Sequence, residues 1–188
     1  MDTKIIAGLA GLAVFMIVVI IFYNRLVRLR VAALQSWSDI DVHLKKRYEL
    51  LPNLVDTVKA YASHESTTLT HVIERRAMAM KAVTPGEKAR AESMLAETLQ
   101  GLLAVVEAYP ALKADVHFQH LMTQMRELED NIEYARRYYN AAVRHYNIVT
   151  QVFPSNIVAS AFSFVAQEFF ELDAPDIERR QVVARFAG

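Results

Sequence analysis

The sequence has no cysteine and few of the residues that interrupt helices, with five glycines and five prolines among 188 residues. The absence of thiols excludes disulfides, zinc–thiolate sites, thiol catalysis and lipoprotein acylation. Basic and acidic residues number 21 each, so the formal net charge is zero and no large field of one sign attracts nucleic acid. We therefore expect a chain of long helices that has no nucleic-acid partner.

The first part of the chain is an apolar run without charge or proline, from Ile5 to Phe22. Eighteen helical residues span roughly 27 Å at about 1.5 Å each, close to the ~30 Å hydrocarbon core of a bilayer. We predict a transmembrane helix over residues 5–23, preceded by a short segment of residues 1–4, with membrane lipid as its partner. A cleaved signal peptide is the alternative, but the run is long for one and no small-residue cleavage site follows it.

Charged residues at the ends of the span indicate its orientation. Lys4 lies before it, and Arg25, Arg28 and Arg30 follow it. The positive-inside rule then places the short N-terminus outside and the C-terminal domain in the cytoplasm. Small residues between positions 7 and 13 permit close packing of two spans, which leaves a homo-oligomer open, although such residues are common in membrane helices.

Beyond the span, apolar residues recur every three or four positions, the period of an amphipathic helix. A stripe from Leu26 to Leu51 follows the anchor without a breaker, which predicts one continuous helix. Pro52 is expected to end or bend this helix, because proline removes a backbone donor and disfavours helix in the preceding residue. A second helix is expected over residues 53–81.

Two more helices are predicted after the second. Residues 84–87 have the sequence of a capped helix start, and Pro110 is expected to stop that third helix. The fourth carries a seam of alternating three- and four-residue spacings from Phe118 to Phe153, and Pro154 ends it. The fold class is therefore all-α, with the transmembrane helix continuing into an antiparallel up-and-down four-helix bundle over residues 24–153. A two-stranded coiled coil is the alternative.

Residues 154–188 form an apolar segment followed by a polar tail. Ser155 is expected to cap a short helix that carries apolar residues through Phe170, more of them than one helix face requires. We expect this segment to fold over an end of the bundle, and the alternative is an interfacial position against the membrane or a partner. The polar tail contains three candidate docking residues, Val182, Val183 and Phe186.

The sequence lacks a recognisable catalytic pattern. The pair His64-Glu65 is not followed by the second histidine of a zinc protease, and His117 and His120 have no carboxylate at the spacing that bundle metal sites use. Asp41 borders the apolar stripe and needs a partner such as Lys45, which favours a structural pair. Phosphate-binding loops and nucleophile elbows are missing. We predict no catalytic residue, no cofactor and no metal site.

Five short motifs stand out in the sequence: WSDIDV at 37–42, LLPNLVDTVK at 50–59, YASHE at 61–65, ARRYYNAAV at 135–143 and YN at 146–147. Together they resemble the bacterial LemA family. The resemblance runs from the anchor to about Phe164, and at Ser163 the chain departs from the glycine that members often have between two phenylalanines. These motifs supply the candidate interaction or structural residues Trp37, Asp41, Pro52, Asn53, Lys59, His64, Glu65, Asn140, Tyr146 and Asn147.

The resemblance implies a bacterial inner-membrane anchor before a cytoplasmic four-helix bundle, with no established enzymatic reaction. Some members are encoded near membrane metalloproteases, which suggests a membrane protein partner. We expect a non-enzymatic membrane-anchored scaffold or adaptor that acts by protein contact or self-assembly. The alternatives are a membrane-remodelling homo-oligomer and a subunit or regulator of a membrane enzyme such as a metalloprotease. An enzyme would have to use Asp41, His64 and Glu65.

Overall fold

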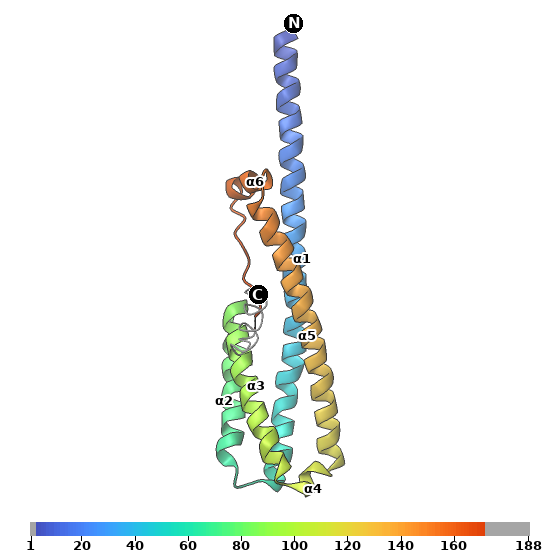
Figure 1. Ribbon diagram of the computed structural model, residues 1–188, viewed down its shortest axis with the longest axis vertical. Coiled ribbons are helices and arrows are strands. Elements are labelled where there is room, and N and C mark those ends of the chain that lie inside the picture. The colour runs from blue at the N-terminus through green and yellow to red at the C-terminus, as the bar shows by residue number, and fades with distance from the viewer. Residues whose placement is uncertain (1–2, 172–188) are drawn as a thin grey trace, which may run out of the picture. The chain divides into compact units, whose positions relative to one another are not determined.

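A computed structural model describes residues 3–171, and its regular structure within that part of the chain is entirely helical (Figure 1). The helices are α1 (Thr3–Tyr61), α2 (Ser66–Lys81), α3 (Pro85–Glu107), α4 (Pro110–Lys113), α5 (Val116–Gln151) and α6 (Ser155–Ala161). The prediction of an all-α chain with a long apolar N-terminal helix is confirmed. The up-and-down four-helix arrangement stays a prediction.

The chain divides into two compact units that share α1 and α5. Among the described residues, the first unit contains those up to Asp39 together with Arg137–Glu168, and the second contains Ile40–Arg136 together with those from Phe169 to Glu171. A buried cluster of the first unit joins α1, α5 and α6 through Leu26, Tyr146, Val149, Val158 and Ala159. The second unit has its own core, in which Leu44, Leu51, Leu95, Leu102 and Leu112 are fully buried.

Helix α1 contains the predicted anchor and continues from it without interruption, as expected. Its first part is long and apolar enough to cross a membrane. Apolar side chains such as Leu12 and Ile17 are exposed there, whereas Leu26 and Ile40 further along are fully buried. So many exposed apolar side chains are unfavourable in water but not in lipid, because contact between apolar surface and lipid has no hydrophobic free-energy cost.

Pro52 does not end this helix, and the prediction of a second helix over residues 53–81 is wrong, whereas a bend at Pro52 stays a prediction. Helix α1 includes Pro52 and ends at Tyr61, and α2 begins only at Ser66. The proline has no N–H to donate to the carbonyl of Tyr48, four residues earlier. That carbonyl instead accepts a hydrogen bond from the Arg76 Nε atom of α2 at 2.6 Å. A side chain from the neighbouring helix thus satisfies the backbone group that the proline leaves open.

The capped start of α3 is confirmed. The Thr84 hydroxyl accepts from the Glu87 N–H at 3.2 Å, and the Glu87 carboxylate accepts from the Thr84 N–H at 3.2 Å. Helix α3 ends at Glu107, before the predicted stop, and Pro110 begins the short α4. The α5 seam is largely buried from Phe118 to Val149, but Phe153 is 79% exposed because the helix ends at Gln151.

The segment after α5 differs from the expected helix. Ser155 does not cap α6 but donates its hydroxyl to the carbonyls of Val149 at 2.7 Å and Val152 at 3.0 Å, near the end of α5. The helix was expected to continue through Phe170, but α6 ends at Ala161 and the residues after it are not helical. The candidate docking residues of the tail lie outside the described residues; they are Val182, Val183 and Phe186.

Candidate functional site

The residues singled out in the sequence motifs are divided between the two units. The first unit contains Trp37, Asn140, Tyr146 and Asn147. The second contains Asp41, Pro52, Asn53, Lys59, His64 and Glu65.

In the first unit, two of these residues fasten the non-helical segment after α6 to α5. The Tyr146 hydroxyl donates to the Val165 carbonyl at 2.9 Å. The Asn147 side chain donates from Nδ2 to the Gln167 carbonyl at 2.9 Å and accepts the Gln167 N–H at 2.8 Å. An amide that pairs with both backbone groups of one residue acts like a neighbouring strand, so the role of Tyr146 and Asn147 is structural.

The same segment is held at a third point beside the single tryptophan. The Tyr139 hydroxyl donates to the Glu168 carbonyl at 2.8 Å. The Tyr139 ring also packs against the Trp37 ring at 5.3 Å between centroids, with 53° between the planes. Asn140 lies half-buried on the same helix. This part of the first unit is therefore a packing surface for the chain itself.

In the second unit, the candidates for an enzyme lie apart. The Asp41 carboxylate pairs with Lys45 at 2.7 Å, the structural partner that the sequence suggested. His64 is exposed and Glu65 half-buried in the turn between α1 and α2. From Asp41 to Tyr61 the chain is one helix, a length of roughly 30 Å at about 1.5 Å per residue. Asp41 therefore does not share a site with the His64-Glu65 pair.

Metal ligation has no structural support in the described part of the chain. His117 and His120 are both exposed on α5. Within residues 3–171, no three histidine, aspartate or glutamate side chains approach closely enough to hold a metal ion.

Pro52 and Lys59 line a small groove of about 350 Å³ between α1 and α2, with Leu69 on the α2 side. Asn53 is exposed, and its backbone carbonyl accepts the Thr57 hydroxyl at 2.7 Å. These contacts involve only residues of α1, α2 and the turn between them.

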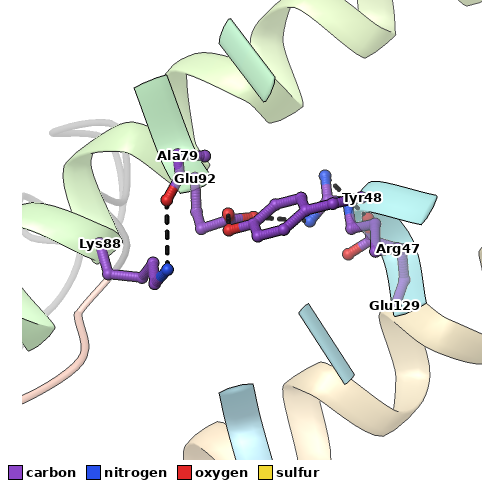
Figure 2. Close-up of polar contacts among 6 residues, drawn as sticks. All are labelled: Arg47, Tyr48, Ala79, Lys88, Glu92 and Glu129. Atoms are coloured by element: carbon purple, nitrogen blue, oxygen red, sulfur yellow. Dashed lines mark hydrogen bonds and ion pairs between the residues drawn. The ribbon is translucent and has the colours of Figure 1, made fainter. Parts of the chain in front are cut away.

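A buried polar cluster in the second unit was missed by the sequence analysis (Figure 2). Arg47 of α1 is at its centre, with a side chain that is only 4% exposed. Its Nη1 atom donates to Glu92 of α3 at 3.0 Å, and its Nη2 atom lies 3.0 Å from the Glu129 carboxylate of α5. The Tyr48 hydroxyl donates to the other oxygen of Glu92. We call these residues, together with Lys88, the Arg47 cluster.

Lys88 completes the cluster from α3. Its ammonium donates to the Ala79 carbonyl of α2 at 3.2 Å and lies 5.6 Å from the centre of the Tyr48 ring, within the range of a cation–π contact. The cluster therefore connects all four long helices that contribute to the second unit (Figure 2).

The electrostatics of the cluster favour a structural role over catalysis. Burial raises the pKa of the Glu92 carboxyl group, against the opposing effects of Arg47 and the Tyr48 hydrogen bond. Burial also raises the pKa of the Tyr48 hydroxyl, and the nearby Glu92 charge adds to this effect. Shifted carboxylates often mark active sites, but ion-pair networks shift them too. Both Glu92 oxygens are bonded within the chain and its side chain is 3% exposed, so a substrate has no access.

A signal for the cluster was present in the sequence. The α3 stripe of Leu95, Leu99, Leu102 and Val106 extends backward at spacings of three and four to positions 92 and 88. Those positions hold a glutamate and a lysine where an apolar residue is expected. Charges at seam positions are costly unless they are paired, so they predict partners on neighbouring helices.

Beside the cluster lies a groove of about 870 Å³ in the second unit. Its lining comes from α3, α4 and α5 and includes apolar residues, namely Leu99, Leu103, Val106, Phe118, Met122 and Met125. Charges of both signs are interspersed with them, including Glu107, Lys113, Arg126 and Asp130. Arg47 also lines this groove, and its buried Nε atom has no hydrogen-bond partner among the described residues. We call this feature the α3–α5 groove.

Comparison with known proteins gives a consistent family assignment. The model of the LemA family matches residues 36–186. The expectation that the resemblance ends near Phe164 is therefore wrong, because the match includes most of the tail. The chain is 25% identical to the magnetosome proteins MamQ 1 and MamQ 2 of Paramagnetospirillum magneticum, covering 88% of this chain and 71% of each relative. It is 24% identical to magnetosome protein MamQ of Magnetospirillum gryphiswaldense, covering 85% of this chain and 68% of the relative.

Proposed function

The chain belongs to the LemA family, and on this premise we propose that it is a membrane-anchored, non-enzymatic adaptor that binds a helix of another membrane protein in its α3–α5 groove. In this proposal, α1 crosses the bacterial inner membrane with its short N-terminus outside. The helices beyond it form a cytoplasmic four-helix bundle. The excess of arginine after the span favours that orientation.

The observation that carries the proposal is the composition of the groove. A lining of apolar residues interspersed with charges of both signs fits the apolar face and polar flanks of an amphipathic helix, a common form of helix-in-groove recognition. Met122 and Met125 in its lining are flexible and adapt to differently shaped side chains.

The absence of a substrate-accessible site in the Arg47 cluster supports the non-enzymatic part of the proposal. All contacts of Glu92 are internal, and Asp41 is paired with Lys45. The magnetosome relatives are consistent with a membrane-associated role. The chain would act by contact, with the cluster keeping the walls of the groove in place.

Site-specific photo-crosslinking in the native host tests this function. A photoreactive amino acid replaces Gln100, an exposed residue of the groove, and a control carries it at Met80, which is exposed on α2 outside the groove. We expect a discrete adduct with an identified membrane protein only from position 100. Leu103→Glu should abolish the adduct, and Met80→Glu should leave it unchanged.

The other outcomes are equally informative. An adduct of twice the mass of the chain would show that two copies of the chain bind each other, which contradicts the adaptor and favours a homo-oligomer that remodels the membrane. An adduct with a membrane protease whose activity then depends on the groove would identify a regulator of that enzyme. Equal labelling from both positions, or none from either, would contradict a role of the α3–α5 groove.

A further inference from the structure

The α5–α6 corner, residues 152–162, groups four large apolar side chains that are about half exposed or more. Phe153 is 79% exposed and Ile157 is 60% exposed, and Val152 and Phe162 are about half exposed. Charged residues are absent from the sequence between positions 146 and 167. Exposed apolar side chains grouped in a stretch without charge are unfavourable in water and indicate a surface that is covered in the cell.

Contacts within the first unit fix the level of this corner along α1. The ring of Phe162 lies 4.9 Å from the ring of Tyr23, the residue that ends the predicted span. The cluster that contains Val158 and Ala159 of α6 also packs against Val19 and Phe22 of α1. Val19 lies four residues before Tyr23, a helical rise of about 6 Å toward the centre of the span.

The corner therefore lies beside the last turn of the membrane span, not beyond it (Figure 1). Tyrosine is favoured at the membrane–water boundary, where its ring is in an apolar layer and its hydroxyl in a polar one. Arg25, Arg28 and Arg30 follow at once and are exposed, a position suited to lipid phosphates.

We propose that the α5–α6 corner is a second membrane contact, which inserts Phe153, Ile157 and Phe162 between the headgroups and acyl chains of the leaflet from which α1 emerges. One face of α6 binds α1 through Val158 and Ala159, and the opposite face binds lipid. Interfacial segments of this kind enter the bilayer by roughly 5–10 Å, comparable with the level that the Val19 contact sets. The inference concerns the lipid surface and is independent of any partner in the α3–α5 groove.

Depth-dependent quenching in a bilayer tests this contact. The chain has no native cysteine, so single cysteines can be labelled cleanly in the full-length protein. An environment-sensitive fluorophore is attached at Ile157→Cys, at Phe153→Cys and, as a control, at Tyr138→Cys. Tyr138 is exposed on α5 in the same unit, fifteen residues or roughly 22 Å before Phe153 along the helix.

The labelled proteins are reconstituted in vesicles of phosphatidylcholine and phosphatidylglycerol that contain lipids with a spin label near the glycerol end of the acyl chain. We expect several-fold stronger quenching at positions 153 and 157 than at 138, together with a blue-shifted emission. Water-soluble iodide should quench in the reverse order.

Two outcomes would overturn the proposal. If positions 153 and 157 are as accessible to iodide as position 138, the corner lies in water. If their emission is blue-shifted without lipid quenching and the particle mass doubles, a second copy of the chain covers the corner. Far-UV circular dichroism of each labelled variant verifies that the helices are retained.

Discussion

Replacement of Arg76 by methionine tests whether a side chain of α2 compensates for the proline in α1. Pro52 cannot donate to the Tyr48 carbonyl, which instead accepts from Arg76 Nε at 2.6 Å. Without that donor, a partly buried carbonyl loses its hydrogen bond. We expect Arg76→Met to lower the free energy of unfolding by about 1–3 kcal/mol, the typical cost of an unsatisfied buried polar group.

A double-mutant cycle with Pro52→Ala isolates this effect. Alanine restores the backbone N–H at position 52, so the Tyr48 carbonyl regains its helical donor. The cost of Arg76→Met should then fall by about 1 kcal/mol relative to its cost beside Pro52. Urea unfolding of the full-length chain in a mild detergent, followed by far-UV circular dichroism, gives all four free energies.

Arg75 provides a matched control on the same helix. Its guanidinium contacts the sulfur atoms of Met78 and Met94 and has no bond to the α1 backbone. Arg75→Met should cost the same with Pro52 or with alanine. If the cost of Arg76→Met also agrees in the two backgrounds within about 0.5 kcal/mol, the compensation argument is refuted.

Three further predictions concern single sites. Ser163 has φ of 56°, in the left-handed region, so Ser163→Gly should raise the free energy of unfolding by about 0.5–1 kcal/mol, and a loss of stability would contradict this. Asn147→Ala should remove both bonds to Gln167 and speed hydrogen exchange in residues 165–168, with α5 unchanged. Hydrogen bonds from the Phe118 N–H, and then from the Tyr61 hydroxyl, lower the pKa of the Asp115 carboxyl group from its ordinary value of 3.8. The ionised carboxylate therefore stabilises the folded chain fully above pH 3.8, and this stabilisation is lost as the pH falls through the lower pKa of the folded state. In thermal unfolding measured over a series of pH values, Asp115→Asn should reduce the decrease in unfolding temperature at acid pH.

The sequence predicted the helices well wherever local signals and burial agreed. The capping box at Thr84 and the apolar seam of α5 required only residues close in the chain. Continuity between the anchor and the next helix followed from the lack of a breaker. Each of these features depends on backbone propensity and periodicity, which are local properties.

The failures arose where residues distant in sequence changed the local outcome. Pro52 does not end its helix, which continues to Tyr61, and a bond from Arg76 satisfies the Tyr48 carbonyl that the proline leaves without a donor. Ser155 was expected to cap the following helix, but its hydroxyl bonds to the preceding one. The partners of Arg47 on α3 and α5 lie 45 and 82 residues away in sequence and were not identified for the same reason.

The position of charges on the α1 and α3 seams leads to a hypothesis about register. Leucine stripes at a seven-residue repeat pack almost equally well after a shift of seven residues. An Arg47–Glu92 pair allows only the register in which the two charges meet, because any shift buries both without partners. We hypothesise that the Arg47 cluster contributes uniqueness of packing to the second unit rather than net stability.

Two variants separate uniqueness from stability. Glu92→Leu alone should cost about 3–5 kcal/mol, because Arg47 keeps only Glu129, which is half exposed. The triple variant Arg47→Met, Tyr48→Phe and Glu92→Leu removes both charges and the hydroxyl together, so its stability should lie within about 2 kcal/mol of the native value. Its far-UV circular dichroism should be native, while its near-UV signal should weaken as the packing becomes heterogeneous. A native near-UV signal in the triple variant would mean that apolar packing alone selects the register.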